Sequence, residues 1–199
     1  MSVEDGYFDA MFQASDDPWA MRQRWYERRK RALLLACLPL ERYASIFEPG
    51  CANGETSAAL AERCDHLLCH DTSLPAVALA RQRLASFAHV QVEHARLPRD
   101  WPDQRFDLIV LNELCYYLDA ADLDRVIEQA RASLTSTGQV LACHWQAPIE
   151  GCPLSSAQVH AKLDQQLGMQ RLLSHEEADF RLDLWAMDAA SVAQREGLR

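Results

Sequence analysis

The sequence predicts an α/β protein with a doubly wound, mostly parallel sheet of about seven strands. Three observations carry this prediction. Short apolar runs and amphipathic segments alternate repeatedly along the chain. The clearest run, "FDLIVLNEL" from Phe106, is apolar almost throughout, which is typical of a parallel strand buried on both faces. Two extended runs near the end of the chain alternate in polarity, which predicts an antiparallel pair at one edge of the sheet.

The N-terminal part, to about Trp19, is acidic and aromatic and is expected to form a helical cap. A helix is predicted from Pro18 through "WAMRQRWYERRKRALLLACL", because Asp16 or Asp17 can cap it and proline suits a first turn. The segment "ASIFE" (44–48) follows as a short buried strand and leads into a loop of small residues.

The remainder of the chain continues this alternation. Further helices are predicted over residues 55–64, 73–87, 119–138 and 155–168. Gly138 is expected to end the helix over residues 119–138. Strands are predicted over residues 66–71, 89–94, 106–114, 139–145, 170–177 and 179–187. Such alternation favours right-handed crossovers with helices on both faces of the sheet.

Composition and charge narrow the class of protein. The formal net charge of −9 disfavours nucleic acid as a partner. The seven cysteines form no C-x-x-C pair, so buried free thiols in a reducing compartment are expected, with no metal site. The N-terminus lacks a secretory pattern, and the longest apolar run, "ALLLACLPL", is too short to span a bilayer. A cytoplasmic protein without a membrane partner is expected, and no feature indicates an oligomeric state.

The loop after the first strand indicates a ligand. "FEPGCANGETS" begins at Phe47 and places Gly50, Ala52 and Gly54 within five positions. Small residues let the backbone approach a ligand closely, and the start of the next helix adds free N–H donors. The second strand ends at Asp71, where a carboxylate can accept hydrogen bonds from both hydroxyls of a ribose. A cofactor that contains a nucleoside is therefore indicated, and both dinucleotides and S-adenosylmethionine fit.

Three features favour S-adenosylmethionine over a dinucleotide. The loop reads GCANG, so its third small residue comes one position earlier than in G-x-G-x-x-G. Glu48 precedes the loop, where a carboxylate suits the ammonium of a methionine moiety better than an anionic pyrophosphate. The predicted antiparallel pair is also unlike the all-parallel dinucleotide fold.

With these motifs in place, the sequence resembles the class I S-adenosylmethionine-dependent methyltransferases, which have a Rossmann-like sheet. The segments "YFDAMFQASDDPW", "WYERRK" and "LNELCYYL" resemble more narrowly the nodulation protein S (NodS) type, whose members N-methylate a deacetylated chitooligosaccharide. The resemblance implies one methyltransferase domain over residues 1–199. Within it we expect a cap and first helix, a cofactor-binding core, and a substrate-side helix with the terminal strand pair, over residues 1–40, 41–145 and 146–199.

The resemblance assigns the first cofactor-binding residues to the loop, in which Ala52 replaces the middle glycine of the family motif. The residues of this motif are Glu48, Gly50, Cys51, Ala52 and Gly54. Asp71 matches the ribose-binding acid, and Thr72 and Ser73 are expected to line the adenine side.

Family members often carry an aspartate after the third strand that contacts the adenine amine. Either His94 or Arg96 takes that position here, so the contact is expected to rest on backbone groups near Ala95. Asn112 and Glu113 end the fourth strand and are expected beside the methionine part and the transferred methyl.

The resemblance also implies contacts from the N-terminal helix. Arg29 is expected to pair with the cofactor carboxylate, and Trp19 and Tyr26 are expected to close over the site.

The chemistry expected at this site is methyl transfer to a small-molecule acceptor, with S-adenosylhomocysteine as the product. The protein must align a nucleophile with the methyl group and exclude water. Glu113, Tyr117 or His144 is expected to orient the nucleophile or accept its proton. The NodS-like segments favour nitrogen over oxygen, as in an amine such as an amino sugar. The alternatives are a nicotinamide-dependent oxidoreductase on a similar sheet and a non-catalytic protein that binds S-adenosylmethionine.

Overall fold

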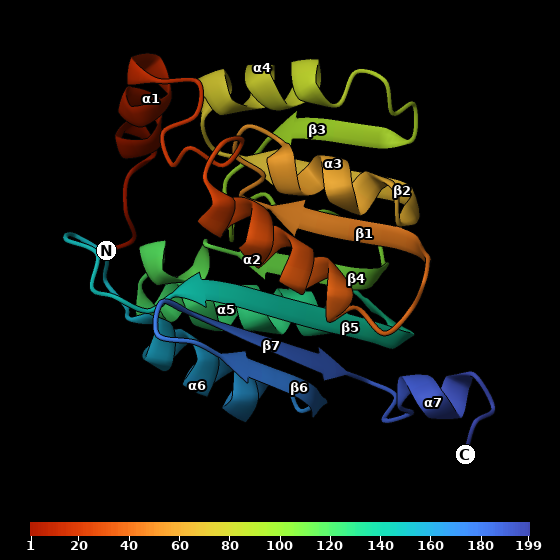
Figure 1. Ribbon diagram of the computed structural model, residues 1–199. Coiled ribbons are helices and arrows are strands. Elements are labelled where there is room, and N and C mark those ends of the chain that lie inside the picture. The colour runs from red at the N-terminus through yellow and green to blue at the C-terminus, as the bar shows by residue number, and fades with distance from the viewer.

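The computed structural model describes all 199 residues and gathers seven strands into one sheet (Figure 1). Their order across the sheet is β3-β2-β1-β4-β5-β7-β6. β7 is antiparallel to both of its neighbours, and the other neighbouring pairs are parallel. The strands are β1 (Tyr43–Pro49), β2 (Cys64–Asp71), β3 (Val90–His94), β4 (Phe106–Asn112), β5 (Leu134–Trp145), β6 (Gln170–Glu176) and β7 (Phe180–Ala186). The predicted mostly parallel sheet with an antiparallel pair at one edge is confirmed.

Helices cover both faces of this sheet. On the face toward the viewer in Figure 1 lie α2 (Trp25–Ala36), α3 (Glu55–Ala61) and α4 (Leu74–Arg83). On the opposite face lie α5 (Ala120–Ala132) and α6 (Ser156–Gln166). Three shorter elements complete the chain: α1 (Asp5–Ala14), the 3₁₀ turn η1 (Cys115–Tyr117) and α7 (Val192–Arg195).

Neighbouring residues of the central strands contribute to two separate hydrophobic cores, because successive side chains of a strand point to opposite faces. Ile46 of β1 belongs to the core under α2, α3 and α4, whereas Phe47 belongs to the core under α5 and α6. Leu108 and Ile109 of β4 divide in the same way. Because β4 is buried on both faces, its sequence is apolar almost throughout.

The helix predicted from Pro18 begins later than expected, at Trp25. Asp17 does act as a cap, and its carboxylate accepts hydrogen bonds from the backbone N–H groups of Met21 (2.8 Å) and Arg22 (3.0 Å). The capped segment is only a turn, because Ala20 has a φ of 55°, which a right-handed helix does not allow.

The helix predicted over 119–138 is also shorter than expected. α5 ends at Ala132, and Gly138 lies inside β5 instead of ending a helix. A Cβ atom at Gly138 would lie 2.8 Å from the side chain of Leu134 and 3.1 Å from the carbonyl oxygen of Phe106. This glycine therefore serves close packing within the sheet rather than helix termination.

The carboxyl ends of β1, β2, β4 and β5 meet at one edge of the sheet, at the left in Figure 1. The N-terminal cover, defined here as residues 1–24, crosses this edge, and its helix α1 lies beside α4. Its backbone is tied down where the N–H of Val3 donates to the carbonyl of Tyr117 (2.8 Å). The fold thus places the cover over the ends of the parallel strands.

Candidate active site

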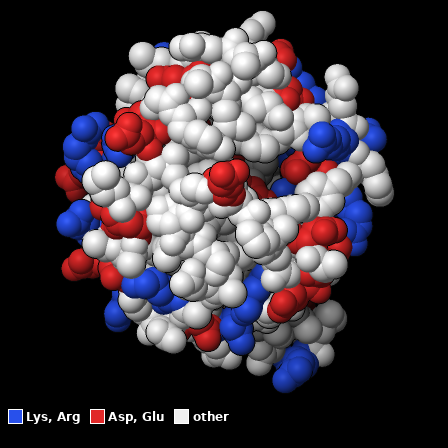
Figure 2. Space-filling model, turned by 90° about the vertical axis from the view of Figure 1, so that its left-hand side faces the viewer, with Lys and Arg blue, Asp and Glu red and all other residues white.

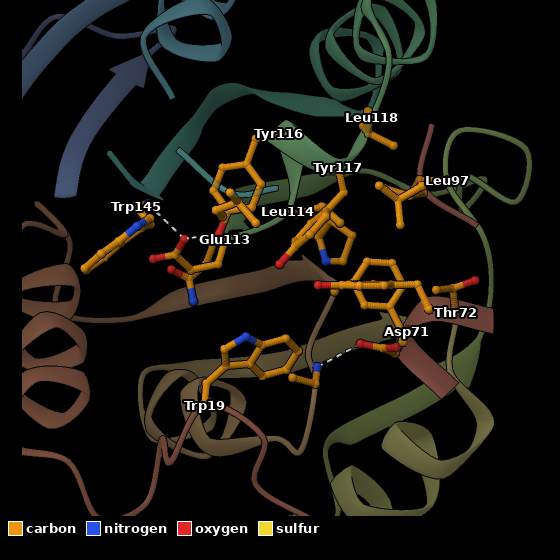
Figure 3. A pocket seen from close by; sticks show the side chains of 18 of the residues that line it. Trp19, Asp71, Thr72, Leu97, Glu113, Leu114, Tyr116, Tyr117, Leu118 and Trp145 are labelled. Carbon is orange, nitrogen blue, oxygen red and sulfur yellow. Dashed lines mark hydrogen bonds between the residues drawn. The ribbon is translucent and has the colours of Figure 1, made fainter. Parts of the chain in front are cut away.

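A cavity of about 550 Å³ opens at this edge of the sheet, beneath the N-terminal cover. Asp71 and Thr72 lie at one end of it, and Glu113 and Trp145 lie at the other (Figure 3). Trp19 of the cover lies across the cavity from Tyr116 and Tyr117, as Figure 3 also shows. Figure 2 views this edge of the molecule, where charged side chains gather toward the rim and the centre is mostly uncharged.

The loop after β1 approaches the cavity with left-handed backbone. Gly50, Ala52 and Gly54 have φ values of 73°, 52° and 81°. A Cβ atom at Gly50 would lie 3.2 Å from Leu114, so glycine keeps the loop close to the end of β4. Gly50 and Ala52 line the cavity, whereas Gly54 begins α3 behind it.

Asp71, at the end of β2, fixes the shape of this loop. Its carboxylate accepts hydrogen bonds from the backbone N–H groups of Ala52 (2.8 Å) and Ser73 (2.9 Å). The side chain lines the cavity and is nearly buried, and burial raises its pKa to about 6. Each carboxylate oxygen still has a lone pair with which to accept a hydrogen bond from a ligand hydroxyl.

Three buried polar atoms on lining residues have no partner in the chain. They are the side-chain oxygens of Tyr26, Thr72 and Asn112. A buried polar atom without a partner is costly, so these oxygens are suited to a polar ligand that completes their hydrogen bonds.

Glu113 is the centre of a charged network at the other end of the cavity. Its carboxylate pairs with Lys30 of α2 (2.7 Å) and accepts hydrogen bonds from the backbone N–H of Trp145 (2.9 Å) and from the Tyr116 hydroxyl. Lys30 also pairs with Glu27 (3.1 Å). Burial alone would lower the pKa of Lys30, but the two carboxylates outweigh it and raise that pKa, so the lysine stays charged. Two carboxylates and one ammonium leave a net negative charge beside the cavity.

The structure separates the two candidates for the adenine-contacting position. Arg96 lines the cavity and pairs with Asp5 of the cover (2.9 Å), and Ala95 lines the cavity next to it. His94 is exposed outside the cavity and its ring donates to the Thr72 carbonyl (3.0 Å).

Several predicted residues support the cavity without lining it. Ser73 caps α4 and donates to Asp9 of the cover (2.7 Å), and Cys51 is buried within the loop. Glu48 is also buried outside the cavity, where the thiol of Cys69 lies 3.9 Å from its carboxylate. The expectation that Glu48 lies beside a ligand ammonium is therefore corrected: its side chain is buried and does not line the cavity.

The burial of Glu48 predicts a pH-dependent stability. Burial raises its pKa from 4.5 to about 7, so the folded state binds a proton that the unfolded state releases. The contribution of Glu48 to the free energy of unfolding is therefore fully present below pH 4.5. It is lost as the pH rises through 7, which lowers the free energy of unfolding by about 3 kcal/mol. Urea unfolding should show Glu48→Gln gaining stability over the wild type between pH 5 and 8, by an amount on this order.

The matched control is Glu62→Gln, which changes an exposed glutamate at the end of α3 and should follow the wild-type pH curve. Parallel stability curves for Glu48→Gln and the wild type would contradict the assignment.

His144, one of the three residues expected to orient the nucleophile or accept its proton, does not lie at the cavity. The residue is fully buried and does not line the cavity. Its Nε2 accepts the backbone N–H of Cys115 (3.2 Å), and its Nδ1 lies 3.1 Å from His160 Nε2. Both ring nitrogens are therefore occupied by protein groups.

The prediction for Arg29 is also corrected. Its guanidinium makes a bidentate pair with Glu177 (2.7 Å for each bond) and does not line the cavity. Arg24 and Lys30, which no sequence motif singles out, do line it. Arg24 is exposed at the cavity and takes part in none of the ion pairs of the chain.

The aromatic residues of the cover were predicted only in part. Trp19 lines the cavity as expected and packs edge-to-face on Phe12, with ring centroids 5.6 Å apart. Tyr7 and Phe8 line it too, and the Phe8 ring lies 4.9 Å from that of Tyr117. The aromatic content of the first residues was the signal for these contacts, but only the fold shows which rings line the cavity.

No three histidine, cysteine or acidic side chains come together in an arrangement that could hold a metal ion. Nor does any helix have the length and apolarity needed to cross a bilayer.

The strand order, the antiparallel β7, the small-residue loop after β1 and the acid that ends β2 together define the class I methyltransferase fold. The family described as nodulation protein S (NodS) matches residues 10–148, and the chain belongs to this family. Nodulation protein S of Rhizobium tropici is 31% identical over 130 residues, which cover 64% of this chain and 55% of that protein. The chain thus spans about half the length of this curated relative.

Two solved structures are also similar. A crystal structure from Pseudomonas syringae, of a protein provisionally called a methyltransferase, is 62% identical and has a TM-score of 0.74, covering 82% of this chain and 99% of that one. The N-methyltransferase NodS from Bradyrhizobium japonicum WM9, in complex with S-adenosylhomocysteine, has a TM-score of 0.82 at 22% identity. That likeness covers 91% of this chain and 96% of that one, and at this identity it shows the fold.

Proposed function

We propose that the protein is an S-adenosylmethionine-dependent methyltransferase that methylates the nitrogen of a small-molecule amine, such as an amino sugar. The observation that carries this proposal is the arrangement of one cavity with Asp71 at one end and the Glu113 network at the other. The first end suits a ribose, and the second suits a positively charged sulfonium. The choice of nitrogen is supported by membership of the NodS family, because NodS of Bradyrhizobium japonicum is described as an N-methyltransferase.

The lining residues fit the cofactor from end to end. Asp71 would hold the ribose hydroxyls, and the unpartnered oxygen of Thr72 and the backbone near Ala95 would meet the adenine. The unpartnered Asn112 oxygen would accept a hydrogen bond from the ammonium of the methionine part. The bound cofactor supplies a methyl group already activated by its sulfonium.

The remaining task of the protein is to orient a neutral amine and exclude water. Tyr117 lines the cavity, and burial raises its pKa, so it stays a neutral phenol. Its oxygen can accept a hydrogen bond from the amine and direct the nitrogen lone pair, but it does not serve as a base. The negative charge of the Glu113 network stabilises the positive charge that moves to the nitrogen during transfer.

Arg24 is our candidate for the partner of the cofactor carboxylate. Arg24→Ala should weaken S-adenosylhomocysteine binding about 10-fold, the effect of losing one charge-assisted hydrogen bond. Titration calorimetry measures this directly. Arg29→Ala is the matched control, because Arg29 is held by Glu177 away from the cavity and its loss should change the affinity less than about twofold. The reverse order of effects would restore Arg29 as the partner.

The function itself is tested by titration calorimetry with S-adenosylhomocysteine, with NADH as the control ligand. Micromolar binding of the first without the second supports the cofactor assignment. NADH binding in its place would favour an oxidoreductase. Release of S-adenosylhomocysteine in the presence of an acceptor then separates an enzyme from a non-catalytic binder, and amino sugars are the first acceptors to screen.

We also propose that the protein acts in a reducing compartment, the cytoplasm. All seven cysteines are free thiols, and most of them are buried in the two cores.

A further inference from the structure

Three fully buried polar side chains form a line through the core behind the cavity. They are His144 of β5, His160 of α6 and Asp183 of β7, each with an exposed fraction of 0%. His144 Nδ1 lies 3.1 Å from His160 Nε2, and His160 Nδ1 lies 2.6 Å from the Asp183 carboxylate. Outside this line, Arg181 donates to the same carboxylate (2.7 Å).

The direction of every hydrogen bond in this line follows from its two ends. The Cys115 backbone N–H can only donate, so His144 Nε2 must carry a lone pair. His144 Nδ1 must then carry the proton and donate to His160 Nε2. His160 Nδ1 in turn carries a proton and donates to the Asp183 carboxylate, which can only accept. Both rings are therefore neutral with the proton on Nδ1. Burial agrees, since it holds the pKa of His144 well below its usual value.

At the His144 end, the line of buried side chains contacts the turn η1. Cys115 begins η1, whose Tyr116 and Tyr117 line the cavity. The His144 ring also packs edge-to-face on Tyr116, with centroids 5.3 Å apart. Tyr116 donates to Glu113, which has a left-handed φ of 52°. Because η1 follows this strained residue, its position depends on hydrogen bonds such as the one from the Cys115 N–H to His144.

We propose that His160 and Asp183 are positioning residues that fix His144 as the Nδ1–H tautomer, so that its Nε2 anchors η1 and sets Tyr116 and Tyr117 for the acceptor. The proposal rests on the proposed function for its catalytic consequence. With the other tautomer, His144 Nε2–H would face the Cys115 N–H, and two donors would repel the turn from β5. No residue of the line touches the cavity, so the effect reaches the acceptor only through η1.

A matched pair of substitutions at position 144 tests this role. His144→Gln places an amide oxygen near the position of Nε2 and can still accept the Cys115 N–H, whereas His144→Leu fills similar space without an acceptor. We expect both variants to bind S-adenosylhomocysteine within about threefold of the wild type, because the ribose end is untouched. We expect His144→Leu to lower kcat at least about 30-fold and His144→Gln less than about fivefold, since only the first leaves the buried N–H without an acceptor.

The two outcomes that would overturn the proposal are equal losses in kcat, which a general base would produce, and no loss in either variant. If His144→Leu fails to fold, nitrogen NMR of the histidine-labelled wild-type protein decides instead. It should show His144 and His160 as Nδ1–H tautomers between pH 6 and 8, with signals assigned by loss in His144→Gln and His160→Gln. An Nε2–H tautomer or an imidazolium at either position would overturn the proposal. Because this readout and the binding measurement need no turnover, failure of the methyltransferase assignment would be distinguishable from failure of the positioning role.

Discussion

Replacing Asp71 with alanine is expected to weaken S-adenosylhomocysteine binding at least about 100-fold. Hydrogen bonds to a charged group contribute about 1.5–3 kcal/mol each, and the substitution would remove both of the bonds proposed to the ribose. It also releases the N–H groups of Ala52 and Ser73, which hold the loop and the start of α4 in place. Titration calorimetry provides the affinity of the variant.

The control for this variant lies on the same strand. Asp65 sits at the other end of β2, exposed and paired with Arg42 (2.6 Å), so Asp65→Ala should leave the affinity unchanged. A pH series adds a second readout: because the pKa of Asp71 is about 6, wild-type affinity should fall as the carboxyl takes up a proton below that pH. An Asp71→Ala variant with wild-type affinity would refute the ribose assignment.

Replacing Glu113 with glutamine is expected to lower kcat about 100-fold or more while changing S-adenosylhomocysteine affinity less than about fivefold. The carboxylate has three donors around it, from Lys30, Trp145 and Tyr116, and an amide can accept from only some of them. The substitution also removes the net negative charge at this end of the cavity. A negative charge would favour a sulfonium placed roughly 6 Å away by about 1–3 kcal/mol. S-adenosylmethionine affinity should therefore fall about 10-fold more than that of S-adenosylhomocysteine, whose sulfur carries no charge.

Glu177→Gln is the matched control for Glu113→Gln. Glu177 also pairs with a cation of α2, but with Arg29 outside the cavity, so its replacement should alter neither kcat nor the ratio of the two affinities. Initial rates and parallel titrations with the two cofactor forms give all the required values. Equal losses of affinity for the two forms would contradict the electrostatic role of Glu113.

The order of helices and strands was predictable because hydrophobic periodicity and the loops between elements are both visible in short stretches of sequence. The boundaries that moved depend on contacts distant in sequence. Asn53, in the loop after β1, donates to Asp17 (3.0 Å) and to the carbonyl of Asp16 (3.2 Å), which holds the cap segment against the loop as a turn. Gly138 was interpreted as a helix end, but its role depends on the packing of Leu134 and Phe106 around β5.

Much of the candidate site was predictable wherever a motif lies at the end of a strand, as for Gly50, Asp71 and Asn112. The orientation of a helix was not, because the run "RRKR" offers neighbouring cations about 100° apart around the helix axis. Lys30 faces the cavity, and Arg29 faces the edge of the sheet. His144 failed as a candidate for a related reason, since the partners that occupy its ring come from α6 and η1.

The N-terminal cover leads into α2, and no strand of the sheet comes from it. It touches the loops after β1, β2 and β3 through Asn53, Ser73 and Arg96. The rings that the cover turns toward the cavity belong to no strand, so they can change without altering the strand order or the hydrogen bonds of the sheet. The aromatic lining of the cavity can then change between relatives while Asp71 and the loop after β1, at the strand ends, keep the ribose end as it is.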